Sequence, residues 1–435
     1  MKKIIIISYY SKPSNFIGAE RIKGWLSYLP KNGIYPVLIT RFWDENQNDT
    51  SKNNISKENK IEKHKNYEIH RVSLKYGLRD SLIRKNKFIF IRKILSLSQI
   101  IFNNLIFTKS EYYPFFTYVD QFLKNNKEFE TVIVSGTPFH SFSIGYNIKK
   151  RYPNINWHPD YRDQWTTHPF KPKLTFIEKL IFGIESKKEL KWTSNSCSFI
   201  AVSEDWRDRI QDKIEKPGFV VKNGFDSDIN QIKEQDIPRK KGEITISYIG
   251  SIYPYQDFEK LLDVISHLNE TKNVKIKINF IGIDAYHDIS SKIKQISKNY
   301  SELIFISKRI PAEELEHIYA QSDLLWLTSF GEMQGWYPVK LFDYASTGIP
   351  ILLYPSDNDV MEKFIKQTRT GYSFTERSKL EEWLLDIINS KLQIKLKINK
   401  TELKKYTREN QAKNLVTQIN NISQKKIVGN EQINF

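Results

Sequence analysis

The sequence predicts an α/β protein made of two doubly wound domains that face a cleft. Its 435 residues exceed what one hydrophobic core usually supports, so two domains are expected. With 40% hydrophobic and 27% charged residues, the composition is that of a globular protein. Short apolar runs alternate with helical stretches, and this alternation begins again near the middle of the chain, which is typical of parallel sheets covered by helices.

The first domain opens with an isoleucine-rich run at residues 3–9. This run is too short for a typical helix, and its β-branched residues indicate a strand that is buried on both faces. Apolar residues recur at helical spacing over residues 19–29, and residues 35–40 supply the next strand. The β-α-β order implies a right-handed parallel sheet. Later strands of this domain are expected at residues 131–135, 154–158, 199–203 and 219–222.

The second domain begins after residues 222–243, a stretch of low hydrophobicity in which Asn, Asp, Gly and Lys cluster. A new strand is expected at residues 244–250, followed by a helical stretch. Further strands are expected at residues 275–281, 303–306, 323–327 and 351–354. We therefore expect an N-terminal domain at 1–222, a C-terminal domain at 223–400, a helix at 401–424 that packs back on the N-terminal domain, and a tail at 425–435.

Two segments of the first domain depart from the alternation. Residues 45–66 are rich in Asn, Lys, Asp and Ser and indicate a polar loop. In residues 84–107, apolar side chains recur at helical spacing and basic side chains gather in the first part of the segment. This pattern describes a basic amphipathic helix. This helix either packs on the sheet in the ordinary way or faces a membrane or an acceptor.

The net charge of +17 suits an anionic partner, which can be nucleic acid, anionic lipid or a phosphorylated substrate, although an AT-rich coding genome also explains many lysines. The single cysteine, Cys197, cannot form an intramolecular disulfide. The first residues lack a secretory signal, and no stretch of about 18 apolar residues occurs. A cytoplasmic location is expected, with any membrane contact peripheral, at the inner face of the plasma membrane.

The most informative segment lies between the strands expected at residues 323–327 and 351–354. Pro338 stands where the first residue of a helix tolerates a missing N–H, and Gly348 with Pro350 marks the end of that helix. Open α/β sheets bind ligands at this edge, outside the carboxyl ends of the strands. The free N–H groups at the start of the helix suit a phosphate.

Lys340 and Asp343 give this helix the groups that a nucleotide diphosphate needs. Lys340 adds a positive charge in the first turn. Asp343 lies on the same helical face and can accept hydrogen bonds from two ribose hydroxyls. The alternative is an ordinary exposed ion pair, which contributes little to stability.

The segment Pro338-Val-Lys-Leu-Phe-Asp-Tyr-Ala-Ser-Thr-Gly-Ile-Pro350 resembles the donor-site signature of bacterial GT-B glycosyltransferases of the family-4 (group 1) type, in which a Pro-x-Lys-x-Phe-Glu-Tyr helix start precedes Gly-x-Pro. Three more segments are similar to parts of the same family. They are Val221-Lys-Asn-Gly-Phe-Asp226, Tyr248-Ile-Gly-Ser251 and Asp160-Tyr-Arg-Asp-Gln-Trp165. The four segments occur in the family's order and span most of the chain.

The resemblance implies two Rossmann-like domains, an acceptor-side N-terminal domain and a C-terminal domain that binds the nucleotide sugar. It also implies a retaining, metal-independent transfer from a nucleotide diphosphate sugar to a glycan or an undecaprenyl-type lipid-linked acceptor. Surface polysaccharide biosynthesis, such as that of O-antigen, lipopolysaccharide or capsule, is the pathway it implies. We expect no cofactor besides the donor substrate, and no metal.

The chain departs from the family's donor site at several positions. Gly335 occupies the position of the first of two family glutamates, with Glu332 nearby, and Ser251 and Gln256 stand roughly where an Arg and a Lys hold the diphosphate. Other cations must therefore neutralise the diphosphate. The candidate donor-binding residues are Gly18, Arg21, Gly250, Lys308, Arg309, Glu332, Gly335, Lys340, Leu341 and Asp343.

Three residues of the first domain are candidates for catalysis. By position, His140 matches the family's active-site histidine, whose implied role is to steady the transferred sugar; a structural histidine is the alternative. Asp160 and Asp163 follow a strand end, where they either bind the acceptor or belong to a carboxylate–guanidinium cluster that orders the loop. The loop at Gly18 and Arg21 approaches a ligand in the family, and a plain loop is again the alternative.

Three other kinds of protein share some of these features. An epimerase of the same shape would bind a nucleotide sugar but need no acceptor. A nucleic-acid-binding protein would explain the charge, yet no nucleic-acid-binding motif is present in the sequence. A dinucleotide-dependent dehydrogenase would need Gly-x-Gly-x-x-Gly after a first strand, and neither half of the sequence has it.

Overall fold

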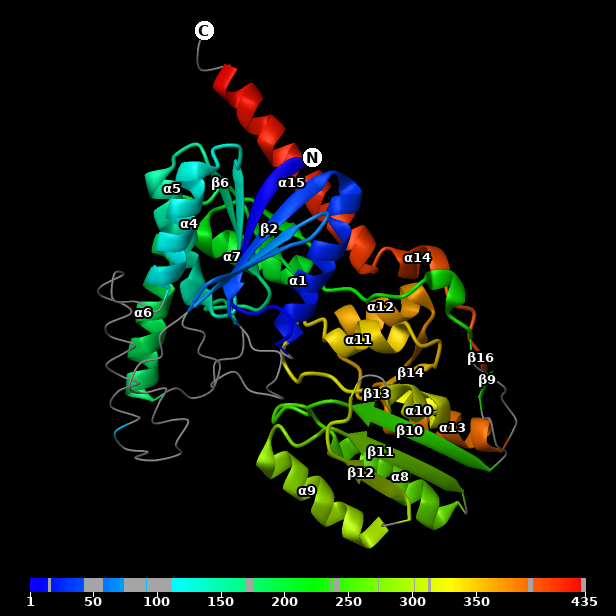
Figure 1. Ribbon diagram of the computed structural model, residues 1–435. Coiled ribbons are helices and arrows are strands. Elements are labelled where there is room, and N and C mark those ends of the chain that lie inside the picture. The colour runs from blue at the N-terminus through cyan, green and yellow to red at the C-terminus, as the bar shows by residue number, and fades with distance from the viewer. Residues whose placement is uncertain are drawn as a thin grey trace. The chain divides into compact units, whose positions relative to one another are not determined.

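The protein is described by a computed structural model that divides into two compact units, each with its own sheet and core (Figure 1). Unit 1 comprises residues 1–223 and 408–435, and unit 2 comprises residues 224–407. The residues described are 1–14, 17–42, 58–73, 91, 112–168, 175–234, 236–237, 242–272, 274–300, 302–311, 314–389 and 394–431. The basic helix expected at 84–107 lies outside these residues, apart from residue 91.

Unit 1 is built on an eight-stranded sheet of order β3-β4-β2-β1-β5-β6-β7-β8, in which β3 alone runs antiparallel to its neighbour. The strands are β1 (Lys2–Ser8), β2 (Ile34–Arg41), β3 (Lys60–Lys63), β4 (Glu68–Val72), β5 (Thr131–Ser135), β6 (Asn156–Tyr161), β7 (Phe199–Ala201) and β8 (Gly218–Val220). Strand β3 lies inside the stretch expected to be a polar loop. Arg71 of β4 explains part of this difference, because its guanidinium pairs with both carboxylate oxygens of Glu62 on β3.

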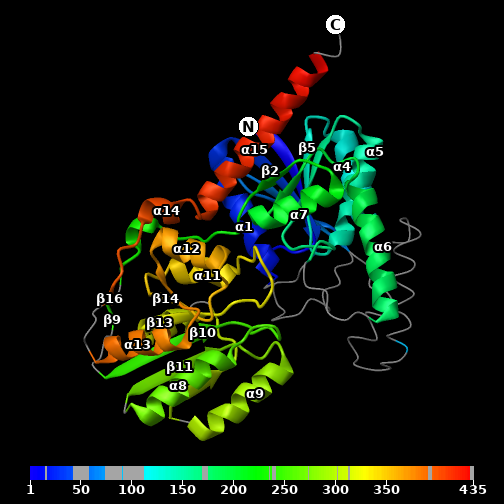
Figure 2. The same cartoon turned by 180° about the vertical axis from the view of Figure 1, so that it is seen from behind.

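Helices cover the sheet of unit 1. They are α1 (Ile17–Tyr28), α4 (Tyr113–Asn125), α5 (Phe142–Arg151), α6 (Phe176–Thr193), α7 (Glu204–Ile214) and α15 (Arg408–Glu431), with 3-10 turns η1 (Pro30–Asn32) and η3 (Phe139–Ser141). Helices α1 and α15 lie side by side (Figures 1 and 2). Ala412 and Leu415 of α15 pack with Trp25 of α1 over Ile4 and Ile6 of β1. The end of the chain thus completes the core of the first unit, and α15 continues into the stretch expected to be a loose tail.

Unit 2 contains a six-stranded parallel sheet of order β12-β11-β10-β13-β14-β15 and a small antiparallel pair, β16-β9. The strands are β9 (Asp236–Ile237), β10 (Glu243–Ile249), β11 (Lys275–Ile281), β12 (Ile304–Ser307), β13 (Leu324–Leu327), β14 (Ile351–Leu353), β15 (Gly371–Ser373) and β16 (Ile394–Lys395). The helices are α8 (Glu259–Thr271), α9 (His287–Ser297), α10 (Leu315–Gln321), α11 (Val339–Ala345), α12 (Val360–Thr368), α13 (Arg377–Ile388) and α14 (Lys400–Lys404), with 3-10 turns η4 (Ile229–Gln231) and η5 (Lys298–Tyr300).

The core of unit 2 has two layers because successive strand residues point to opposite faces. Along β13, Leu324 and Trp326 pack with α8, α9 and α13 on one face. Leu325 and Leu327 pack with α11, α12 and α14 on the other. Two helix-covered sheets, one wholly parallel and one parallel except for β3, confirm the expected α/β class. Within the described part of the chain, no helix combines the length and the apolar character needed to cross a bilayer.

The glycine that ends the segment after α11 is required by its surroundings. Gly348 has a φ of +79°, and a Cβ placed there would lie 2.0 Å from the carbonyl oxygen of Lys233. Gly242 has nearly the same φ, +80°, but an added Cβ would meet nothing within 4 Å. Both glycines lie in unit 2. An alanine at Gly242 would carry backbone strain alone, whereas an alanine at Gly348 would carry backbone strain and a steric clash.

We expect Gly348→Ala to lower the free energy of unfolding by about 3 kcal/mol, since it combines an unfavourable φ with a clash against backbone. Gly242→Ala should lower it by only about 1 kcal/mol, because it carries the φ penalty alone. Urea unfolding followed by circular dichroism measures both. Equal losses in the two variants would contradict this account of Gly348.

Candidate functional site

The segment that carries the donor-site resemblance joins β13 to α11 in unit 2. Pro338 is the residue before α11 and has an extended backbone, with φ −67° and ψ 143°. Helix α11 has seven residues, and the N–H of Leu341 already donates to the carbonyl of Pro338 over 3.0 Å. Fewer free N–H groups therefore remain at the start of the helix than the sequence predicts, so a ligand here would depend more on side chains.

Lys340 is the cation that this helix places at the end of β10. Its Nζ donates to the hydroxyl of Tyr248 over 2.6 Å and to the carbonyl of Ser251 over 3.0 Å. The same Nζ lies 4.0 Å from the centre of the Tyr248 ring. The amino group is thus fixed by β10 and by the turn that follows it, and it can hold a ligand without ordering a flexible side chain first.

The surroundings of Lys340 disfavour its charge. Burial lowers the pKa of its amino group to about 7, and the nearby carboxylate of Asp343 only partly opposes this effect. The two groups that accept hydrogen bonds from Lys340, a phenol and a backbone carbonyl, carry no full negative charge. An anion bound at this point would favour the charged form of Lys340.

Gly250 forms the tight turn that leaves room beside Lys340. Its φ is +94°, which favours glycine, and its N–H donates to the carbonyl of Ile281 over 2.7 Å. A Cβ at this position would lie 3.7 Å from Nζ of Lys340. The structure therefore brings the expected glycine turn and the expected lysine together.

The two residues that stand where the family has its Arg and Lys support the site from within. Ser251 contributes its backbone carbonyl, not its side chain, to Lys340. Gln256 is buried, and its Oε1 accepts from the N–H of Tyr253 over 2.9 Å while its Nε2 donates to the carbonyl of Thr328 over 3.4 Å. Gln256 thus shapes the turn after β10 rather than replacing a cation.

Asp343 is partly buried one turn along α11. Its charge adds to burial in raising the pKa of the Tyr319 phenol, and it counteracts the lowered pKa of Lys340. The carboxylate therefore lies near both groups. Lys340 and Asp343 both belong to α11, three residues apart, which is the spacing of one helical face.

The other donor-site candidates of unit 2 lie in different settings. Gly335 is buried at φ +72°, and its N–H donates to Asp359 over 2.6 Å. The Leu341 side chain is completely buried in the core, so only its backbone is near the site. Lys308, Arg309 and Glu332 are exposed. Lys308 and Arg309 directly follow β12, two strands away from β10.

In unit 1, Arg21 and Asp160 form an ion pair in the interior. Arg21 Nη2 lies 2.8 Å from Asp160 Oδ1, and both side chains are at most 3% exposed. Ser135 also donates to Asp160 over 2.8 Å, and Arg21 Nη1 donates to the carbonyl of Val221 over 2.9 Å. Both charges are therefore already compensated within the protein, as in a carboxylate–guanidinium cluster with a structural role.

Gly18 and Asp163 both lie near the segment around Arg162. Nη2 of Arg162 donates to the carbonyl of Thr137 over 2.7 Å, and its Nε donates to the carbonyl of Gly136. A Cβ on Gly18 would lie 1.4 Å from Arg162 Nη1, so glycine is needed for this approach. Asp163 is exposed and accepts from the hydroxyl of Thr137 over 3.1 Å.

His140 belongs to a network that the sequence did not reveal. Its Nε2 lies 3.0 Å from Oε2 of Glu185 on α6, and Lys188 donates to Oε1 of the same carboxylate over 3.1 Å. Trp165 Nε1 donates to Glu185 as well, over 3.1 Å. Burial alone would raise the pKa of Glu185, but the hydrogen bonds and charges of His140 and Lys188 outweigh it and lower this pKa.

Two groups compete for Nε2 of His140. The ionised Glu185 can only accept a hydrogen bond from this nitrogen, whereas Nζ of Lys188 lies 3.2 Å away and can donate to it. Glu185 lies 45 residues after His140 on a helix with no local motif, which explains why the sequence gave no sign of it. Within the described residues, no three His, Cys, Asp and Glu side chains are grouped so as to hold a metal ion.

Comparisons with known proteins bear on the family and the fold. Residues 230–426 match the family model described as glycosyl transferases group 1. A solved structure of the lipopolysaccharide outer core galactosyltransferase WaaB is similar at 13% identity and a TM-score of 0.57, covering 98% of this chain and 99% of that one. A glycosyltransferase from Rickettsia africae gives 10% identity and a TM-score of 0.58, covering 97% and 99%.

A third solved structure is that of Alr3699/HepE from Anabaena in complex with UDP-glucose, at 13% identity and a TM-score of 0.51, covering 99% of each chain. At these identities the likeness is one of fold. No curated protein sequence matches the chain.

The lowered pKa of Lys340 predicts how stability depends on pH. Between pH 7 and 10.5 the unfolded chain holds a proton on this lysine that the folded chain has lost, so this group makes stability rise with pH. Lys340→Met removes the titration. We expect the melting temperature of the variant, minus that of the wild type, to be largest at or below pH 7 and to shrink towards pH 10. Calorimetry across this range tests the sign, and a difference that does not change with pH would contradict it.

Proposed function

We propose that this chain, a glycosyltransferase of group 1 with the GT-B fold, uses the Lys340 site to bind a nucleotide diphosphate sugar and transfers the sugar to a glycan or lipid-linked acceptor. The observation that carries the proposal is the Lys340 amino group, fixed beside the Gly250 turn and short of a negative partner. The match at residues 230–426 includes this whole region.

A diphosphate is the ligand that suits Lys340. The amino group has only neutral acceptors, and burial has lowered its pKa to about 7. A bound diphosphate would supply the missing negative charge at close range, where the low local dielectric makes the attraction strong. Gly250, whose φ of +94° favours glycine, places no side-chain atom beside this amino group.

The same interaction would assist the reaction. Glycosyl transfer passes through an oxocarbenium-like state in which the leaving diphosphate gains negative charge. A cation that is already positioned stabilises this charge without reorganising at the moment of reaction. Lys340 would thus bind the donor and stabilise the leaving group. A metal-independent reaction is proposed on this basis.

Asp343 would select the nucleoside part of the donor. Its carboxylate can accept hydrogen bonds from two neighbouring ribose hydroxyls, as the helical spacing from Lys340 predicts. A phosphate donor and a ribose acceptor on one face of α11 together describe a nucleoside diphosphate.

In unit 1, His140 is our candidate for steadying the transferred sugar. Its Nε2 is engaged by Glu185 and Lys188, which leaves Nδ1 for a hydrogen bond with a sugar hydroxyl. A retaining outcome and a role in surface polysaccharide biosynthesis, on the cytoplasmic side of the membrane, belong to the same proposal. They rest on the sequence resemblance, as does peripheral contact with an anionic membrane.

We expect a nucleoside diphosphate to raise the melting temperature by about 5 °C or more when present at a hundredfold excess over its Kd. A thermal-shift comparison of uridine, guanosine and thymidine diphosphates identifies the base. Lys340→Met should weaken binding about 100-fold, because a charge-assisted contact is lost, and Asp343→Ala at least about tenfold.

The matched control is Lys366→Met, since this lysine of unit 2 is 69% exposed on α12 and should not affect binding. Nucleotide affinity that is unchanged in both the Lys340 and Asp343 variants would refute the donor site. Conversion of a sugar nucleotide without any acceptor would favour an epimerase instead.

Donor binding should also take up a proton. Above pH 7 the free Lys340 is largely neutral, while the diphosphate stabilises its charged form, so the affinity should fall about tenfold per pH unit as the pH rises above 7. Titration calorimetry with uridine diphosphate in buffers of different ionisation enthalpy measures this uptake. It should approach one proton in the wild type and disappear in Lys340→Met. A wild-type affinity that is constant from pH 7 to 9 would contradict this mechanism.

A further inference from the structure

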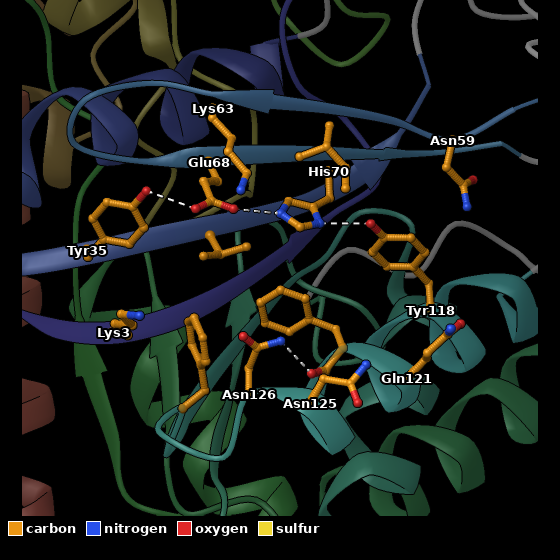
Figure 3. A pocket seen from close by; sticks show the side chains of 14 residues that line it. Lys3, Tyr35, Asn59, Lys63, Glu68, His70, Tyr118, Gln121, Asn125 and Asn126 are labelled. Atoms are coloured by element: carbon orange, nitrogen blue, oxygen red, sulfur yellow. Dashed lines mark hydrogen bonds and ion pairs between the residues drawn. The ribbon is translucent and has the colours of Figure 1, made fainter.

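A pocket of about 600 Å³ lies in unit 1, between the C-terminal half of α4 and the strands β1 to β4. Figure 3 shows its labelled side chains, which include Tyr35, Glu68, His70 and Tyr118. Its volume is in the range of small-molecule sites. None of the residues that line it was expected to be functional, so the donor and acceptor arguments do not account for it.

One wall of the pocket is a continuous chain of hydrogen bonds. Tyr35 donates to Glu68 Oε1 over 3.1 Å, Nε2 of His70 lies 3.1 Å from Glu68 Oε2, and Nδ1 of His70 lies 2.8 Å from the Tyr118 hydroxyl (Figure 3). Burial lowers the pKa of His70, so the ring is neutral near pH 7. Burial works to raise the pKa of Glu68, but its hydrogen bonds to His70 and Tyr35 lower it, so the carboxyl is ionised.

These protonation states fix the direction of every bond in the chain. Glu68 can only accept, so Nε2 of His70 carries the hydrogen and Nδ1 accepts from the hydroxyl of Tyr118. The hydrogens of Tyr35 and Tyr118 are therefore both engaged inside the wall. What this wall can offer a ligand is acceptors, namely the two phenol oxygens and the remaining lone pairs of Glu68.

The opposite wall offers amides. Gln121, Asn125 and Asn126 of the α4 end lie across from the chain in Figure 3. Asn126 donates to the carbonyl of Phe122 over 2.8 Å. Gln121 and Asn125 are exposed and make no side-chain hydrogen bond to any other described residue. Each brings two donors and a carbonyl acceptor to the pocket.

Aromatic rings lie between the two walls. Phe122 is partly exposed and stands edge to face with Phe129, with ring centres 5.1 Å apart, and with His70, at 5.3 Å. A ring supported in this way presents a rigid apolar surface, against which the C–H face of a ligand ring can pack. The pocket thus combines an apolar floor, a wall of acceptors and a wall of amides.

This combination excludes the other common ligand classes. A phosphate would face the ionised Glu68, and a carboxylate already opposes the charge of each lysine in the lining. Lys3 pairs with Glu128 over 3.0 Å, and Lys63 lies near enough to Glu68 to lower the pKa of its carboxyl. A metal ion would find a single carboxylate, which is already engaged with Tyr35 and His70. A ligand with many hydroxyl groups satisfies all three surfaces, because each hydroxyl both donates and accepts.

We propose that this pocket is a saccharide-binding subsite that holds a glycan segment away from the transfer site. The saccharide class is supported by the lining and rests also on the proposed function, since a glycan acceptor is a ligand of that class. Lys3, Tyr35 and Glu68 lie at the starts of parallel strands, whereas Gly136 follows the end of β5. The length of these strands separates the pocket from the strand ends by roughly 15 Å.

The test is saturation-transfer-difference NMR on the full chain with a panel of disaccharides: maltose, lactose, cellobiose, mannobiose and diacetylchitobiose. At least one should receive saturation from the wild type and from Lys340→Met, in which the donor site is impaired. The double variant Gln121→Ala/Asn125→Ala should weaken that binding by at least about tenfold, because two hydrogen-bonding amides are removed.

Both substituted amides are exposed, so the double variant should fold, which circular dichroism checks. Lys124→Ala, on the same helix but outside the pocket lining, is the matched control and should leave binding unchanged. The inference is overturned if no disaccharide in the panel binds, if binding persists in the double variant, or if Lys124→Ala weakens it equally. Uridine diphosphate binding, measured on the same samples, reports on the proposed function separately, since it involves none of these residues.

Discussion

The site in unit 2 depends on a lysine that is held where its charge is poorly compensated. The Lys340 amino group can reach Tyr248 and Ser251 only because Gly250 turns the chain sharply after β10 and α11 begins directly beside that turn. Burial favours the neutral amine, and Asp343 offsets this effect only in part. The folded protein thus keeps an unfavourable arrangement that a bound anion would relieve, as is common at functional sites.

In unit 1, by contrast, the charge of the buried cation Arg21 is fully compensated. The guanidinium of Arg21 meets a carboxylate and two backbone carbonyls, and Asp160 accepts from Ser135 as well as from Arg21. A pair satisfied in this way is costly to break but has little left to offer a ligand. In the sequence, Arg21 and Lys340 both resembled cations that bind a ligand. The structure distinguishes them by their partners: Arg21 pairs with a carboxylate, whereas Lys340 donates to a phenol and a backbone carbonyl.

The parallel sheet of unit 1 carries polar groups at both of its ends. At the carboxyl ends of β5 and β6 lie the Arg162 and Asp163 segment and the His140–Glu185 network. At the amino ends of β1, β2 and β4 lies the pocket with the Tyr35–Glu68–His70–Tyr118 chain. Each network has a carboxylate within hydrogen-bonding distance of Nε2 of a histidine. The two ends differ in what surrounds the histidine: a lysine and indoles at one end, phenols and amides at the other.

The sequence alone determined the α/β class, most of the parallel strands and the position of Lys340 and Asp343 on one helical face, because these depend on local periodicity and on punctuation by proline and glycine. It did not reveal β3, whose pairing relies on Arg71 and Glu62, nor the role of Glu185, which lies far from His140 in the chain. Whether a charged residue is compensated was likewise decided only by the tertiary structure. That property depends on which atoms of distant segments come within hydrogen-bonding distance, and no local pattern in the sequence records such contacts.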